Sequence, residues 1–204
     1  MMKKIFLVAS LMVLTLAAFA QPEKGTLTLQ PKVGVNVAYF TGSDGVDTKP
    51  RFGLVIGSEL AYQFGECISL SGGIFYSQQG EKAKMETRDI GRVNIIARTD
   101  YVSLPFLASF YVTKGFALKF GAQPAFNVNG SYYASTLYGA RRGDLSSLGI
   151  YVNTFDFSIP VGLSYEYKNF IMDARYDIGI TKLAKYGDSR HRAFQIMVGF
   201  KREL

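Results

Sequence analysis

The sequence lacks tryptophan altogether and contains one cysteine, Cys67, and one histidine, His191, in 204 residues. A single thiol cannot form an internal disulfide bond, so the fold is not held together by disulfides. Cys67 and His191 stand far apart, and no cluster of metal-ligating residues, phosphate-binding loop, dinucleotide-binding fingerprint or internal repeat accompanies them. We therefore expect no cofactor and no metal ion.

Long apolar stretches are also scarce, and the main one lies at the N-terminus. Residues 5–20 carry no charge, follow Lys3 and Lys4, and end in Ala18-Phe19-Ala20. This run is shorter than the ~20 residues that a membrane-spanning helix needs. It predicts a signal peptide over residues 1–20, cleaved before Gln21, and the absence of cysteine at that position argues against a lipid anchor.

The charge balance is basic, with a formal net charge of +7. Cleavage after residue 20 removes Lys3 and Lys4 and no acidic residue, which lowers the charge to about +5. Because an exported chain rarely meets nucleic acid, we expect phosphates of lipids or saccharides as the counter-charge and no nucleic-acid partner.

After Gln21, no helix-length stretch repeats its apolar residues every 3.6 positions, whereas alternation with a period of two recurs up to Lys201. The pattern predicts an all-β fold, with a short lead-in at residues 21–31 and one barrel domain at 32–204. Strands of ~9–11 residues can cross a bilayer when tilted. We predict eight strands, at residues 32–40, 51–64, 67–79, 99–112, 116–128, 154–167, 170–180 and 193–201.

The connections between these strands are of two kinds that alternate strictly. Residues 65–66, 113–115 and 168–169 make tight turns. Residues 41–50, 80–98, 129–153 and 181–192 make long connections. Short periplasmic turns that alternate with long outer loops are typical of bacterial outer-membrane barrels.

The two faces of the predicted strands differ in bulk and polarity. In the second strand, Phe52, Leu54 and Ile56 alternate with small or polar residues such as Gly57 and Glu59. Only the small face fits inside an eight-stranded barrel. No charged residue occupies the apolar register, where a basic side chain would cost ~2–4 kcal/mol in the middle of a bilayer. The sequence predicts a transmembrane, antiparallel, up-and-down β-barrel of the outer membrane.

A soluble lipocalin-like barrel is the rival fold, and it would turn the aromatic face inward. Such barrels normally carry a Gly-x-Trp signature near the first strand, which a chain without tryptophan cannot have. Pro105 and Pro160 fall within predicted strands, where a missing N–H interrupts the hydrogen-bond ladder. We expect a bulge at each proline or a strand boundary there.

Two segments resemble the outer-membrane β-barrel "porin family", the PorT-like small barrels of Gram-negative bacteria. Residues 101–106 (Tyr-Val-Ser-Leu-Pro-Phe) are similar to that family's apolar strand with a central proline, and residues 173–181 (Asp-Ala-Arg-Tyr-Asp-Ile-Gly-Ile-Thr) are similar to its "aRY…GlT" strand and loop entry. The resemblance implies fold and location, with no catalytic motif. Such barrels are inserted by the barrel-assembly machinery and commonly end on an aromatic residue. Here Phe200 precedes four further residues, so the assembly signal is read from Phe200 or is weaker than usual.

Charged residues on the inner face form the first candidate site. We expect a polar network inside the barrel, because an unpaired buried ion is costly. Its predicted members are Glu59, Lys119, Glu166, Asp173 and Arg175. A salt-bridge network that plugs the barrel is the main interpretation, and a narrow or gated path for solutes is the alternative.

Basic residues in the long connections form the second candidate site. Guanidinium groups pair well with phosphate, so these residues point to contact with lipopolysaccharide, and a merely solvated loop surface is the alternative. The candidates are Arg88, Arg92, Arg98, Arg141, Arg142, Arg190 and Arg192.

The function predicted is that of a small outer-membrane barrel without enzymatic activity, with a structural role in the envelope or a binding role of its loops. A narrow, porin-like conduit for small solutes or apolar ligands is the alternative. A lipid-modifying enzyme is the third hypothesis, for which His191, beside Ser189 and Asp188, is the only histidine available. Neighbouring residues in one loop do not define a catalytic geometry.

Overall fold

In the computed structural model, residues 23–41, 47–87, 91–136, 139–148, 152–182 and 190–204 are described. Almost all of them lie in β-strands, together with one short 3₁₀ helix, η2 (Leu145–Leu148). No helix in these ranges is long and apolar enough to cross a membrane. The strands are β1 (Leu27–Thr41), β2 (Asp47–Gln63), β3 (Ile68–Thr87), β4 (Gly91–Ser103), β5 (Phe106–Thr113), β6 (Phe116–Thr136), β7 (Gly139–Asp144), β8 (Phe155–Tyr167), β9 (Phe170–Lys182), β10 (Arg190–Phe200) and β11 (Arg202–Glu203).

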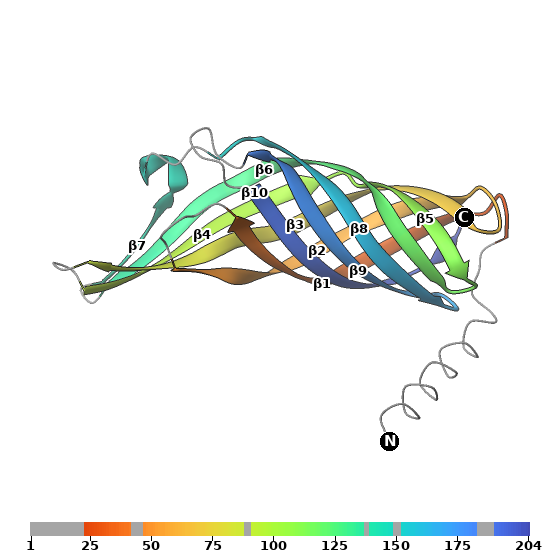
Figure 1. Cartoon of the computed structure of the whole chain (residues 1–204), viewed down its shortest axis with the longest axis horizontal. Helices are drawn as coiled ribbons and strands as arrows, with labels where there is room; N and C mark the ends of the chain where they lie inside the picture. The colour runs from red at the N-terminus through yellow and green to blue at the C-terminus, as the bar shows by residue number, and fades with distance from the viewer. Residues whose placement is uncertain (1–22, 42–46, 88–90, 137–138, 149–151, 183–189) are drawn as a thin grey trace, which may run out of the picture.

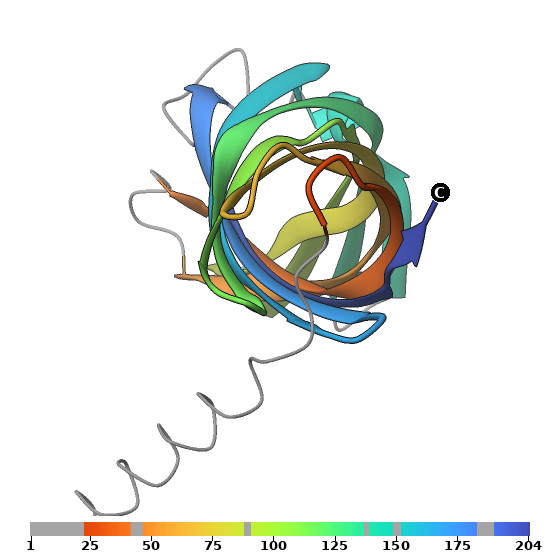
Figure 2. The ribbon, with the colours of Figure 1, turned by 90° about the vertical axis from the view of Figure 1, so that its right-hand side faces the viewer.

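The strands pair into one antiparallel sheet that closes on itself. The order β10-β9-β8-β6-β4-β3-β2-β1 ends where β1 pairs with β10, from Lys32↔Gly199 to Thr41↔Arg190. Strand β5 follows β4 along the same wall of the ring and, like β4, pairs with β3 on one side and with β6 on the other. Viewed end-on, the ribbon is a closed ring (Figure 2). The described chain therefore confirms the predicted eight-stranded antiparallel barrel.

The strand ends differ from the prediction on one side of the ring. Strands β3, β4 and β6 run deep into connections predicted as loops, and β7 adds a further strand beside β6. These residues form strands because β-branched and aromatic side chains, such as Ile95, Ile96 and Tyr132, favour extended backbone. At the other end of the barrel, β1 already begins at Leu27, so residues 27–31 belong to the barrel rather than to a lead-in.

The long strands build a wall that rises from one side of the ring. We call it the β-wall: residues 47–50 of β2, 81–87 of β3, 91–98 of β4, 129–136 of β6, and β7. Figure 1 shows it projecting on the left, beyond the ends of β8, β9 and β10. The short turns and the C-terminus lie at the opposite end (Figure 1). The predicted alternation of short and long connections thus separates two unlike ends.

The apolar face of each strand is on the outside of the ring. Phe52 is 72% exposed and Phe106 is 58% exposed, whereas Glu59 on the opposite face is 0% exposed. Small residues let the strands approach one another: a Cβ on Gly53 would lie 1.8 Å from the carbonyl oxygen of Gln78. The bulky residues face outward and the polar ones inward, as the alternation predicts and opposite to a lipocalin-like barrel.

The two prolines behave differently. Pro105 lies in the break between β4 and β5, where its carbonyl still accepts a hydrogen bond from the Gly73 N–H (3.0 Å). A strand boundary at this proline is confirmed. The bulge or boundary predicted at Pro160 is wrong, because Pro160 stays within β8 and pairs with Asp177 in an unbroken register. On the other side of Pro160, pairing between β8 and β6 lapses without a register shift, which accommodates the missing donor.

Candidate functional site

A cluster of five charged side chains fills the middle of the barrel. Lys32 Nζ donates to Glu59 Oε2 at 2.6 Å and to Asp173 Oδ2 at 2.5 Å. Arg175 Nη2 donates to Glu59 Oε1 at 2.5 Å. Lys119 Nζ lies 3.0 Å from Asp173 Oδ1 and 3.6 Å from Glu59 Oε2. Two carboxylates are therefore shared by three cations, and the five residues come from four strands.

The alternation of the strands explains why these residues meet. Lys32 on β1, Glu59 on β2, Lys119 on β6 and Asp173 and Arg175 on β9 all occupy the inward register. Lys32 was missed by the sequence reasoning, although it shares its parity with the polar Asn36. Alternation could have identified Lys32, because polar residues recur at every second position of β1 on its inner face. Gln30 and Thr28, which precede Lys32 on that face, are both buried.

Glu166, the fifth predicted member, is not in this cluster. It lies nearer the short turns, where Lys201 Nζ donates to Glu166 Oε2 at 2.5 Å and the Tyr111 hydroxyl donates to Oε1 at 2.8 Å. Glu166 and Lys201 are 1% and 6% exposed. The barrel interior therefore holds a second ion pair, separate from the central cluster and closer to the short-turn end.

A third polar layer lies between the central cluster and the β-wall. Asp177 accepts hydrogen bonds from Gln195 (2.8 Å) and Gln123 (3.1 Å). Counting Asp177 with the central cluster gives three acids and three bases, which is neutral. Above it, Thr181 donates to Asp156, and His191 Nδ1 lies 3.7 Å from Asp156 Oδ2. The interior is thus polar over most of its height.

Burial of these ions bears on whether water can pass. Glu59, Asp173, Arg175 and Lys32 are at most 3% exposed, so solvent barely reaches them. A water-filled pore at this level would leave these charges accessible. The barrel is closed by its own side chains at the central cluster.

His191 does not form the loop site that the enzyme hypothesis requires. Its side chain is 3% exposed and lies beside Asp156, with its ring centroid 6.1 Å from that of Tyr101. Ser189 and Asp188 lie outside the described residues. Cys67 is exposed near a short turn, far along the barrel from His191. Among the described residues, no three His, Cys, Asp or Glu side chains could hold a metal ion.

The β-wall presents its side chains in rows, because paired residues of neighbouring strands project to the same face. One row crosses five strands and begins with two lysines and ends with an arginine. Tyr132 and Gly143 belong to the row beside it, on the opposite face, and a Cβ on Gly143 would lie 2.9 Å from the Tyr132 ring. The first row consists of Lys49, Lys82, Ile96, Tyr133 and Arg142, and the second of Pro50, Glu81, Ala97, Tyr132 and Gly143.

The predicted basic residues are only partly brought together. Arg98, Arg141 and Arg142 lie in the β-wall, and the last two are exposed. Arg192 lies on the other side of the ring opening, where it pairs in register with Tyr39 and its Nη1 donates to the Tyr176 hydroxyl at 3.3 Å. The backbone places Arg92 in β4 and Arg190 in β10, and Arg88 lies outside the described residues. Lys49 and Lys82 complete the basic row.

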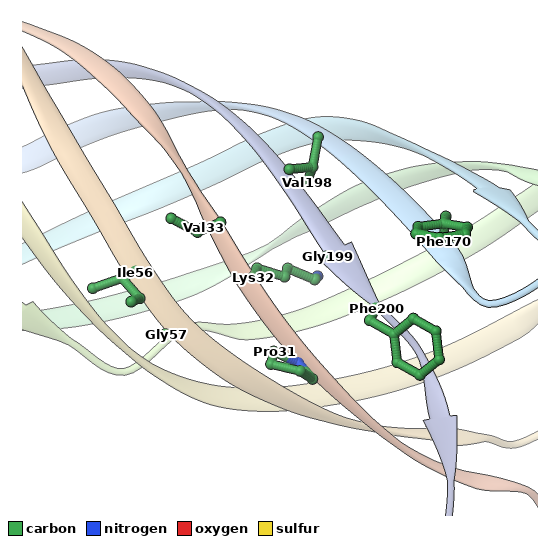
Figure 3. A pocket seen from close by; sticks show the side chains of 9 residues that line it. All are labelled: Pro31, Lys32, Val33, Ile56, Gly57, Phe170, Val198, Gly199 and Phe200. Atoms are coloured by element: carbon green, nitrogen blue, oxygen red, sulfur yellow. The ribbon is translucent and has the colours of Figure 1, made fainter.

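The outer surface of the ring carries an open pocket, or dent, of about 510 Å³ (Figure 3). It lies where the ladder between β1 and β10 is interrupted at Pro31, which has no N–H to donate. Apart from Lys32, whose charged end bonds inside the barrel, the lining is apolar or glycine, so the dent belongs to the apolar outer surface. Its lining residues are Pro31, Lys32, Val33, Ile56, Gly57, Phe170, Val198, Gly199 and Phe200.

Comparison with known proteins agrees with this geometry. Ail, the attachment invasion locus protein of Yersinia pestis, solved in complex with the heparin analogue sucrose octasulfate, shares the fold at 16% identity and a TM-score of 0.52, over 88% of this chain and 99% of Ail. Neisserial surface protein A shares it at 12% identity and a TM-score of 0.50, over 87% of this chain and 97% of that protein. No protein of curated function matches. Residues 19–185 match the outer membrane protein β-barrel domain. The chain therefore belongs to the family of outer-membrane proteins with a β-barrel domain, and it crosses the bacterial outer membrane with its strands.

Proposed function

We propose that this small outer-membrane barrel neither conducts solutes nor catalyses a reaction, and that it acts in the envelope through its β-wall. The observation that carries the proposal is the contrast between the two parts of the molecule. The ring is filled by buried ion pairs around Glu59. The β-wall, in contrast, extends five strands beyond the ring and exposes basic side chains such as Lys82 and Arg142.

The proposal includes an orientation. The short turns face the periplasm and the β-wall faces the outside of the cell, as is usual for bacterial barrels. The turns between β5 and β6 and between β8 and β9 are only a few residues long and offer little surface. A ligand that meets this protein from outside would therefore meet the β-wall.

The absence of catalysis is part of the proposal. His191 is buried against Asp156, and the exposed Cys67 lies toward the other end of the barrel. A closer kinship with the PorT-like small barrels also remains a proposal, as does insertion by the barrel-assembly machinery. The aromatic Phe200, which ends β10 with its side chain 45% exposed on the outer face, suits that recognition.

Conductance of the purified protein in planar bilayers tests the closed barrel. We expect no channel steps from the natural protein, under conditions in which a known porin gives them. In a shortened variant, an Asn-Gly turn replaces residues 83–95 and connects Lys82 with its paired residue Ile96. This variant should also give no channel steps. Stable ohmic channels from the natural protein would establish the conduit instead. Channels from the shortened variant alone would show that the β-wall, and not the ring, closes the path.

A further inference from the structure

The two faces of the β-wall carry different charge. Gln79 and Thr99 are buried inside the ring at 4% and 1% exposure, so alternation places Glu81 and Ala97 on the same, inner face. Lys82 then projects to the outer face. On the outer face the described charged side chains are Lys49, Lys82, Arg98, Arg142 and Asp144; on the inner face they are Glu81 and Arg141.

The net charge of these side chains differs between the faces. Four bases and one acid give +3 on the outer face, and one base and one acid give zero on the inner face. Lys49, Lys82 and Arg142 are exposed. No salt bridge joins any of these three to another residue in the described part of the chain. Their charge is therefore available to a ligand.

The outer face continues the lipid-facing surface of the barrel. Lys49 stands three residues beyond Phe52, which is 72% exposed on the apolar face, and that is about 10 Å along the strand. Plain alternation would put Lys49 on the opposite face, but the register between β2 and β3 shifts between Pro50 and Val55, so Lys49 pairs with Lys82 and shares its outer face. This distance takes the basic row out of the hydrocarbon core and into the layer of lipid headgroups. A soluble ligand entering the barrel mouth would instead meet the inner face, which has no net charge.

The spacing within the row suits a ligand with anionic groups at two ends. Neighbouring strands lie about 4.8 Å apart, so Lys49 and Lys82 form one cationic point and Arg142 a second, about 14 Å from Lys82. Ile96 and Tyr133 lie between them, and a tyrosine ring offers a flat surface for a sugar. Guanidinium and ammonium groups hold phosphate oxygens by charge-assisted hydrogen bonds.

We infer that the outer face of the β-wall binds the phosphorylated sugars of the lipopolysaccharide molecules that surround the barrel in the same membrane. This inference deepens the proposed function and rests on it, since it requires the β-wall to lie outside the cell. The cations at the two ends hold phosphates, and the apolar middle of the row contacts the sugar.

The sequence offers a matched control for the test. The outer-face variant combines Lys49→Gln, Lys82→Gln and Arg142→Gln. The control variant combines Arg141→Gln, on the inner face of the same strand, with Lys24→Gln and Lys114→Gln at the short-turn end. Both remove three exposed cations and change the net charge equally.

Each protein is reconstituted in vesicles of phosphatidylcholine that contain increasing amounts of rough lipopolysaccharide, and binding is followed by the rise in its thermal unfolding midpoint. We expect the outer-face variant to bind at least roughly tenfold more weakly than the natural protein, and the control variant to bind as well as it does. Lipopolysaccharide stripped of its phosphates should bind weakly to all three.

Equal losses in both variants, or no loss in either, would overturn the inference. So would equal stabilisation by phosphatidylglycerol vesicles, because the site would then respond to any anionic surface. Bilayer conductance of the same variants separates this failure from that of the proposed function. If only the ligand assignment is wrong, the barrel gives no channel steps. If the proposed function is wrong because the barrel is open, channel steps appear.

Discussion

At the scale of single residues, Glu59 is the side chain on which the interior depends most. It accepts hydrogen bonds from Lys32 and Arg175 and has Lys119 3.6 Å away. Replacing it by Gln leaves three buried cations with Asp173 as the one carboxylate in direct contact and Asp177 in the next layer. Removing one partner of a buried ion pair costs about 3–5 kcal/mol. We expect Glu59→Gln to lower the free energy of unfolding by about that amount, measured by urea unfolding of the barrel in lipid vesicles.

A pair of controls separates this effect from a general loss of charge. Glu66→Gln removes an acid from an exposed short turn and should change stability by no more than about 0.5 kcal/mol. Lys32→Gln combined with Glu59→Gln removes one charge of each sign, so the double variant should be more stable than the sum of the two single effects predicts. Strict additivity, or an equal cost for Glu66→Gln, would contradict the role of Glu59.

The members of the interior network show what alternation can and cannot reveal. A period of two assigns each residue to a face, and Glu59, Lys119, Asp173 and Arg175, which it assigns to one face, lie together in the structure. It does not say at what height along the barrel each residue lies. That height depends on the stagger between strands, which is set when the ring closes. Glu166 is therefore on the predicted face but in another layer.

At the scale of the elements, β3 is one strand in two environments. Residues 69–79 lie within the closed ring, where β2 flanks them on one side and β5 and then β4 on the other, and residues 81–87 belong to the β-wall. Water reaches both faces of the wall, and its edge strand β7 pairs on one side alone. Local opening should therefore be easier there. We expect backbone amides of residues 81–87 to exchange with deuterium at least roughly tenfold faster than those of residues 69–79, after correction for intrinsic rates, in vesicles.

Both sets of amides belong to the same strand and are measured in the same sample, so differences between preparations do not affect the comparison. Equal protection along the whole of β3 would mean that the β-wall is as stable as the ring, and would argue for a further partner on it. The strongest contrast is expected for the amides of β7, because this strand pairs with β6 alone.

The elements also show where prediction from the sequence ends. The number and order of the ring strands follow from alternation and from the tight turns. The ends of β3, β4 and β6 do not, because beyond the membrane both faces of a strand meet water and the apolar alternation loses its cause. Pairing there depends on the partner strand: residues 81–87 remain extended because residues 91–97 lie beside them in register. A run such as Glu81-Lys82-Ala83-Lys84 is a charged loop when considered alone.

At the scale of the whole molecule, the two ends of the barrel should be distinguishable by a protease that cannot cross the outer membrane. Arg141 and Arg142 lie exposed on the edge strand of the β-wall, whereas Lys114 and Lys168 lie exposed in short turns at the opposite end. With the proposed orientation, trypsin added to intact cells should cut after Arg141 or Arg142 and leave Lys114 and Lys168 uncut. The fragments are identified by mass spectrometry of the purified outer membrane.

Permeabilising the outer membrane supplies the control, because trypsin then reaches the short turns and should cut after Lys114 and Lys168 as well. The ring pairs of β1 to β6 and β8 to β10 do not depend on β7, so a barrel nicked at Arg142 should still migrate as a folded species on an unheated gel. Cutting at Lys114 in intact cells, with the β-wall left whole, would place the wall in the periplasm. Its basic face would then lie away from lipopolysaccharide, which is confined to the outer leaflet. That result would contradict both the proposed orientation and the proposed ligand, and it would leave the closed ring unaffected.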